Sequence, residues 1–259
     1  MEFKQDIKPS GFESAVAYAP FDEALGRLEK ESYRIISTPE NAELRIQQGS
    51  DAFVSRNGNY VREGVLYIPQ KGGFLVRNSP ILTSARQATQ AHRDGKEFYA
   101  TQEQVDEALK DSVKFPEKYV EIPVKRFGED ELTVFVIGGG DSKKAEVYGN
   151  FLKDAGIKAM PVYVVDKDNV NEQNTPFARQ LWFWSLVGGS VLDGDGRDLG
   201  GDCGVRGVRL ISGEASTQKI SDTEKGELYT ARNLKDALNI AGITGGVEKL
   251  VFESLNRKH

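Results

Sequence analysis

Four aspartates lie close together late in the chain, at a spacing that can bind calcium. Asp193, Asp195, Asp198 and Asp202 fall within ten residues of one another. A calcium loop of the EF-hand type needs a Gly at its sixth position and a bidentate Glu at its twelfth. Counted from Asp193, these positions hold Asp198 and Gly204, so the pattern fails. The sequence favours a solvated acidic loop without a metal, and a calcium-dependent sugar site at residues 193–202 stays as an alternative.

The cysteine and histidine content restricts other side-chain chemistry. Cys203 is the single cysteine, which excludes an intramolecular disulfide and a thiolate zinc cluster. It could act as a nucleophile only beside a base, and the one internal histidine, His92, falls in a polar stretch of an expected helix. A structural or surface thiol is therefore favoured. We expect no catalytic residue, no cofactor and no enzymatic activity.

Three consecutive glycines, Gly138 to Gly140, precede a helix predicted over residues 143–155. A phosphate site requires glycines that let the phosphates approach the N-terminus of a helix. The dinucleotide fingerprint would place a further Gly where Lys143 stands, and the P-loop ending is absent. A plain turn is favoured. An enzyme that binds a nucleotide through a strand–turn–helix unit at residues 134–155 stays as the alternative.

Charge and hydropathy narrow the classes of partner and location. The net charge of −5 disfavours a broad nucleic-acid surface. No apolar run approaches the roughly 18 residues that a membrane span needs, and the N-terminal residues lack the hydrophobic core of a signal peptide. We therefore expect no nucleic-acid partner, no membrane span and a cytoplasmic or virion-associated protein, whose oligomeric state the sequence leaves open.

The elements that must position these residues are short and show no internal repeat. Residues 1–20 read as a loose arm. Helical spacing or capping residues predict helices that start at Phe21 and Thr38 and others over residues 84–95, 102–111 (capped by Thr101) and 143–155. Alternation and turn signals predict strands at 33–36, around a hairpin turn at Asn57-Gly58, at 74–76, 120–124 and 161–165. Residues 132–137 fit a strand or a helix equally, and 166–175 read as a loop.

Residues 181–209 are the most unusual stretch of the chain. A run of Gly and Asp separates the aromatic residues 182–184 from the strand-like residues 205–209. So many glycines disfavour a helix, and anchored ends are not typical of a linker, which predicts an irregular surface loop. In an extended strand Trp182 and Trp184 share one face and Phe183 takes the other. Arg206 and Arg209 would lie on opposite faces and could pair with the acidic loop.

Several segments resemble a known family. Residues 84–111 are similar to the paired helices of the C-type lectin fold in its formylglycine-generating-enzyme-like branch, without the Pro and Trp that open the second helix there. The phrases LVRNSP, ATQAHRDGKEFY, RFGEDELT, YGNFLKDAGI and PFARQLWF, with the ending GVRGVR, resemble variable proteins of archaeal and viral diversity-generating retroelements. The resemblance covers roughly residues 64–209. Formylglycine-generating activity does not carry over, because that chemistry needs cysteines absent here.

The resemblance implies an α+β fold of the C-type lectin kind, with two helices and a small twisted antiparallel sheet. Residues 1–50 would form an N-terminal extension, residues 51–215 the lectin-like domain with a variable region at 181–209, and residues 216–259 a C-terminal extension packed on that domain.

The resemblance also implies a function. In such systems an error-prone copy of a template, mutated at adenines, replaces the variable region. The chain would then bind a variable protein or cell-surface ligand. The positions expected to be diversified and exposed to solvent are Trp184, Ser185, Val187, Gly189, Val191, Asp193, Asp195, Arg197, Asp198, Gly200, Gly201, Asp202 and Cys203. The expected scaffold beneath them is Leu181, Trp182, Phe183, Leu186, Leu192, Leu199, Val205 and Val208.

Overall fold

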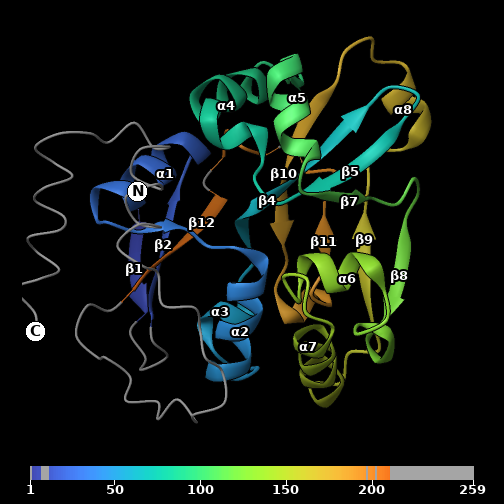
Figure 1. Ribbon diagram of the computed structural model, residues 1–259. Coiled ribbons are helices and arrows are strands. Elements are labelled where there is room, and N and C mark those ends of the chain that lie inside the picture. The colour runs from blue at the N-terminus through green and yellow to red at the C-terminus, as the bar shows by residue number, and fades with distance from the viewer. Residues whose placement is uncertain (1, 7–11, 197, 202, 211–259) are drawn as a thin grey trace, which may run out of the picture. The chain divides into compact units, whose positions relative to one another are not determined.

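The computed structural model describes residues 2–6, 12–196, 198–201 and 203–210 (Figure 1). The chain divides into two compact units, Met1–Gly213 and Glu214–His259. The second unit lies outside the described residues, as does the predicted extension at 216–259. In the first unit, residues 12–50 supply strands and helices that are integral to the fold.

The first unit is built on a mixed sheet of twelve strands. They are β1 (Glu2–Asp6), β2 (Phe12–Ala19), β3 (Arg34–Ile35), β4 (Asn59–Ile68), β5 (Gly72–Val76), β6 (Phe98–Tyr99), β7 (Ser112–Lys114), β8 (Val120–Pro123), β9 (Ala159–Tyr163), β10 (Phe177–Phe183), β11 (Leu192–Asp193) and β12 (Cys203–Leu210). The main path runs β1-β2-β12-β4-β10-β11-β9-β8. Two pairs, β11 with β9 and β12 with β4, are parallel, and the other pairs are antiparallel.

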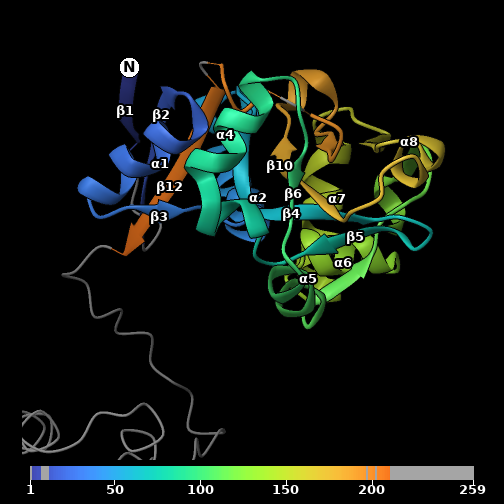
Figure 2. The ribbon, with the colours of Figure 1, turned by 90° about the horizontal axis from the view of Figure 1, so that it is seen from above.

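Eight α-helices and three short 3-10 helices surround the sheet within the described residues. They are α1 (Phe21–Lys30), α2 (Thr38–Gln48), α3 (Phe53–Arg56), α4 (Ala85–Arg93), α5 (Gln102–Leu109), α6 (Glu131–Val136), α7 (Ser142–Asp154), α8 (Lys167–Asn171), η1 (Pro80–Ser84), η2 (Val124–Arg126) and η3 (Leu186–Gly188). α1 lies beside α4 in both views (Figures 1 and 2). Capping boxes begin two helices, at Ser37 with Glu40 and at Thr101 with Gln104.

The sheet separates two hydrophobic cores because successive side chains of a strand point to opposite faces. On β4, Val61 and Val65 join one core together with side chains of α2 and α7. Tyr60 and Leu66 of the same strand join the other, with side chains of α1, α4 and α5. Helices therefore cover both faces of the sheet, and each core lies between one face of the sheet and the helices that cover it.

The N-terminal segment is the clearest correction to the sequence-based expectations. Instead of a loose arm, residues 12–19 form β2, which lies between β1 and β12. Figure 1 shows β12, drawn orange, beside β2, drawn blue. All eight residues of β12 pair with β2, from Cys203 opposite Ala19 to Leu210 opposite Phe12. The apolar residues 15–17 are buried by this pairing and by α1.

Other local predictions were also wrong. Residues 53–56 form α3 rather than a strand, so Asn57-Gly58 is no hairpin turn. For residues 132–137, which fitted a strand or a helix, the structure has the helix: they belong to α6 and its end, and the Asp130 carboxylate caps this helix by accepting from the Thr133 amide at 3.0 Å. Residues 167–171 form α8 within the expected loop. The sheet is much larger than the small antiparallel sheet expected, since β2, β3 and β12 extend it.

Candidate ligand-binding surface

The chain between β10 and β12 forms one irregular surface segment, which we call the display loop (residues 184–203). It contains η3 and the two-residue strand β11. β11 pairs with β10 on one side and with β9 on the other. Leu186, Leu192 and Leu199 are buried, which confirms the inward direction expected for them. The display loop is thus fastened to the sheet at its middle as well as at its ends.

The residues expected to be exposed fall into three groups, apart from Val191, which is buried. Trp184, Val187, Asp195 and Asp198 are exposed, with 43% of Trp184 and 81% of Val187 accessible. Ser185, Gly189, Asp193, Gly200, Gly201 and Cys203 are half-buried. Arg197 and Asp202 lie outside the described residues. Trp182 and Trp184 share a face of the chain, with ring centroids 6.5 Å apart, and Phe183 is fully buried on the other, as alternation predicts.

Val191 does not face solvent as expected, because only 4% of it is accessible. Its carbonyl accepts from the Trp184 amide at 3.0 Å, which draws this residue under the loop just before β11. Gly189 is constrained differently. It ends η3 in the left-handed conformation, with φ of 88°, where any other residue type is strained. Neither position is free to take arbitrary side chains.

A buried arginine holds the first half of the display loop from below. Arg45 of α2 is fully buried, and its guanidinium lies 4.0 Å from the ring centroid of Phe183. Its Nη1 donates to the Tyr148 hydroxyl at 3.1 Å and to the Ser190 hydroxyl at 3.4 Å. Its Nη2 donates to the Phe183 carbonyl at 3.4 Å. This network fixes Ser190, which has a positive φ of 59°.

A second buried arginine, Arg179, binds the backbone of the second half of the display loop. Arg179 of β10 donates through Nη1 to the carbonyls of Asp195 and Gly196, at 3.2 and 3.4 Å. Its Nη2 pairs with the Glu97 carboxylate at 2.6 Å. The Asp193 carboxylate tightens the same turn, since its Oδ1 accepts from the amides of Asp195 and Gly196 at 2.9 and 3.1 Å. The acidic run is therefore a hydrogen-bonded turn.

A pocket of about 210 Å³ opens where the display loop meets the sheet. It is lined by Tyr60, Trp182, Trp184, Asp193, Gly196, Asp198 and Cys203. The ring of Tyr60 meets that of Trp182 edge to face, with centroids 4.8 Å apart. Burial, together with the negative charges of Asp198 and Asp193, raises the pKa of Tyr60 well above its ordinary value. Nothing in the sequence indicated Tyr60, because β4 precedes the display loop by more than a hundred residues.

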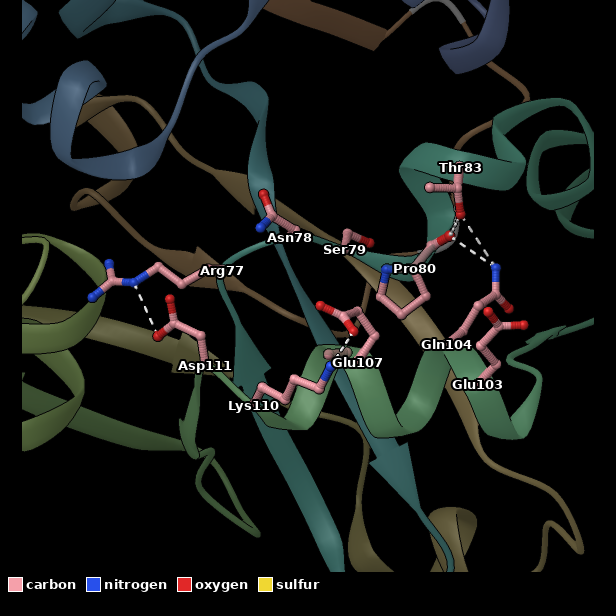
Figure 3. A pocket seen from close by; sticks show the side chains of 11 residues that line it. Arg77, Asn78, Ser79, Pro80, Thr83, Glu103, Gln104, Glu107, Lys110 and Asp111 are labelled. Atoms are coloured by element: carbon pink, nitrogen blue, oxygen red, sulfur yellow. Dashed lines mark hydrogen bonds and ion pairs between the residues drawn. The ribbon is translucent and has the colours of Figure 1, made fainter. Parts of the chain in front are cut away.

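A larger pocket, of about 460 Å³, lies between α5 and the segment that follows β5 (Figure 3). Its charged side chains are largely paired with each other. Arg77 Nε lies 3.5 Å from the Asp111 carboxylate, and Lys110 lies 2.5 Å from that of Glu107. Arg77 also donates to the Phe135 carbonyl at 2.7 Å. No residue expected in the functional site lines this pocket.

The other candidate residues have structural surroundings. Arg206 is buried and donates to the Ser14 hydroxyl at 3.1 Å, and Arg209 pairs with Glu13 at 2.5 Å. Both of these contacts are supplied by β2. His92 is buried on α4 rather than placed on a polar surface. The Cys203 thiol lies 3.1 Å from the Asp198 carbonyl and 3.4 Å from its carboxylate.

The glycine turn at residues 138–140 is not a strand–turn–helix phosphate site. The segment before it is helix α6, so the expected strand is missing. The Asp141 carboxylate caps α7 and accepts from the amides of Lys143 and Lys144 at 2.9 and 3.3 Å. These are amides that a phosphate would use, and the carboxylate would repel it. The nucleotide-binding alternative therefore loses its structural basis.

Two further features bear on the alternatives. In the part of the chain that the structure describes, no cluster of three or more His, Cys, Asp and Glu side chains is arranged to hold a metal ion. The calcium alternative therefore gains no support from these residues. The helices among the described residues include none that is long and apolar enough to cross a membrane.

Comparison with known proteins identifies the fold. No family model matches the chain, and no curated protein matches it. A solved structure described as "Accommodation of massive sequence variation in Nanoarchaeota by the C-type lectin fold" superposes with a TM-score of 0.52 at 13% identity. The match covers 81% of this chain and 98% of that one. This chain therefore has a C-type lectin fold, extended here by a larger sheet.

Proposed function

We propose that this chain is a non-enzymatic ligand-binding protein whose display loop is diversified by a retroelement. The observation that carries the proposal is that residues 184–203 include both exposed side chains and buried side chains that support the loop. Exposed side chains such as Trp184 and Val187 alternate with fully or nearly buried leucines. Side chains that contact only solvent can change without loss of packing, since surface substitutions usually alter stability by less than about 0.5 kcal/mol.

The support beneath the loop fits such a role. Arg45 and Arg179 bind the backbone carbonyls of Phe183, Asp195 and Gly196, and these contacts do not depend on the exposed side chains. A loop that is ordered before binding loses less conformational entropy on association. The ligand is then a protein or a cell-surface molecule that meets a preformed surface of variable chemistry.

The fold and the sequence resemblance also support the proposal. The solved structure to which the chain is similar carries massive sequence variation on a C-type lectin fold. The phrases that resemble retroelement variable proteins lead directly into the display loop. On this reading the exposed Trp184, Val187, Asp195 and Asp198 belong to the ligand-binding set.

The coding DNA provides the test. We expect a near-copy of the segment for residues 181–209 beside a reverse-transcriptase gene, differing mainly at adenines. Deep sequencing of a population should show variation at the codons of Trp184, Val187, Asp195 and Asp198. The codons for Leu192 and Val191 should stay constant. A locus without a repeat, or variation spread evenly over buried and exposed codons, would contradict the proposal.

A further inference from the structure

The 210 Å³ pocket beside the display loop combines aromatic rings with carboxylates. We propose that it binds a cationic group, the ammonium of a lysine or the guanidinium of an arginine carried by the ligand. That the cation belongs to a protein ligand rests on the proposed function. The chemistry of the pocket itself does not, since it follows from the residues that line it.

The aromatic residues provide the first argument. Tyr60 and Trp182 pack edge to face, and Trp182 and Trp184 lie at 81° to each other with centroids 6.5 Å apart. Because the rings of Tyr60, Trp182 and Trp184 are inclined to one another, they present both ring faces and ring edges to the pocket. The face of an aromatic ring attracts a cation, with Trp the strongest, and the attraction increases when the cation is desolvated.

The carboxylates provide the second. Asp193 and Asp198 line the pocket, and none of the lining residues that the structure describes is basic. Within the described residues, neither carboxylate forms an ion pair. Asp193 is held in place by the amides of residues 195 and 196 and by the Trp184 indole, whose Nε1 donates to it at 3.2 Å. Two negative charges beside aromatic rings complement one positive charge.

The size of the pocket limits the occupant. Clefts that hold drug-sized molecules have volumes of roughly 300–1,000 Å³, whereas this one has about 210 Å³. It suits one side chain rather than a whole small molecule. A lysine or arginine that projects from a protein surface meets this condition, because its apolar stem can lie against the indoles while its charge reaches the carboxylates.

The origin of the lining residues has a consequence for diversification. Tyr60 comes from β4 and Trp182 from the end of β10, and both lie outside the positions expected to vary. Trp184, Asp193, Asp198 and Cys203 come from the display loop. Every variant would keep the same two aromatic residues, and the loop residues would decide whether a cation or another group is bound.

Both tryptophans of the chain line this pocket, so their indole signals report on it directly. We would titrate the ¹⁵N-labelled full chain with N-acetyl-lysine methylamide, N-acetyl-arginine methylamide and the uncharged N-acetyl-norleucine methylamide. At least one cationic probe should shift both indole N–H signals saturably, more weakly at higher salt. The norleucine probe should not. Equal shifts with norleucine, or no shift with either cation, would overturn the proposal.

Variants separate charge from folding. Asp198→Asn and the double variant Asp193→Asn/Asp198→Asn should weaken cation binding, the double variant at least about tenfold. Glu146→Gln/Asp154→Asn removes the same charge from exposed positions on α7 and should change binding less than about twofold. If the double variant fails to fold, Asp198→Asn and Trp184→Ala carry the test, because both side chains are exposed. Unchanged affinity in these would overturn the proposal.

The two proposals fail separately. A locus without a template repeat would remove the diversification mechanism but leave saturable cation binding as it stands. Conversely, the locus could contain the repeat while neither cation shifts the indole N–H signals. That result would refute only the cation site.

Discussion

The guanidinium of Arg45 lies 4.0 Å from the ring centroid of Phe183, and both side chains are fully buried. The charge is spread over the aromatic ring, two hydroxyls and one carbonyl. These contacts satisfy Nη1 and Nη2, as a buried charge requires, whereas Nε has no hydrogen-bond partner among the described residues. The contact joins α2 to the strand from which the display loop departs.

We expect Arg45→Ala to lower the free energy of unfolding by about 3 kcal/mol or more, since it empties a buried volume and removes the hydrogen bonds from Arg45 to Tyr148, Ser190 and the Phe183 carbonyl. Urea unfolding followed by tryptophan fluorescence measures the change. Arg27→Ala is the control, because the exposed pair of Arg27 with Glu31 should contribute less than about 1 kcal/mol. Similar losses in the two variants would contradict the role given to Arg45.

The buried carboxyl of Glu63 predicts a pH dependence. Burial raises its pKa from 4.5 to about 7, against hydrogen bonds from Thr38 that lower it. Since the folded pKa exceeds the unfolded one, the folded state binds more protons between these values. Stability is full below about pH 4.5 and falls as the pH rises to 7, by roughly 3 kcal/mol at about 1.4 kcal/mol per unit.

Glu63→Gln should abolish this slope while keeping an acceptor for Thr38, as urea unfolding at pH 5, 6, 7 and 8 would show. A Glu63→Gln profile identical to that of the unaltered chain would refute the assignment.

Glu40 affects stability in the opposite direction and at lower pH. Burial alone would raise its pKa, but hydrogen bonds from Arg34 and Ser37 lower it to about 2. The contribution of Glu40 to stability is present above about pH 4.5 and is lost as the pH falls towards 2.

The display loop should tolerate change at exposed positions alone. Val187→Ala should alter stability by less than about 0.5 kcal/mol. Leu192→Ala should cost about 2–5 kcal/mol, because Leu192 is fully buried on β11. Thermal and urea unfolding of the two variants give a direct comparison. Equal costs would mean that the loop is not divided into exposed and supporting residues.

Two glycines of the loop form a matched pair. A Cβ at Gly194 would lie 2.8 Å from both Phe115 and Val65, whereas one at Gly196 would meet only the Asp193 carboxylate at 3.9 Å. Gly194→Ala should therefore destabilise by about 1–3 kcal/mol through overpacking. Gly196→Ala should be neutral or stabilise by up to about 1 kcal/mol. The reverse order, measured by unfolding, would show that the loop backbone is placed differently.

The features that sequence predicted well are local ones. Helical spacing marked α1 and α7, and the pair Thr101 and Gln104 marked the capping box of α5. Alternation placed Trp182 and Trp184 together because they lie at the end of a regular strand. The same reasoning failed at Val191, where the chain turns back beneath Trp184 and regular alternation no longer holds.

Long-range pairing could not be predicted in this way. Nothing in residues 12–19 indicates that they pair with β12. The two strands lie about 190 residues apart, and the sequence of one does not specify the other as its partner. Tyr60 enters the candidate site for the same reason, through its register with Trp182 across β4 and β10. The short helix α3 shows that tertiary packing overrides the strand propensity of Phe53 and Val54.

The position of β12 between β2 and β4 also orders the assembly of the molecule. Synthesis delivers β2 first and β12 almost two hundred residues later, so the sheet stays open until the display loop has been made. A frameshift or stop codon within that loop would delete β12 and leave β1 and β2 detached from the rest of the sheet. Completion of the sheet therefore requires a correct reading frame through the whole display loop.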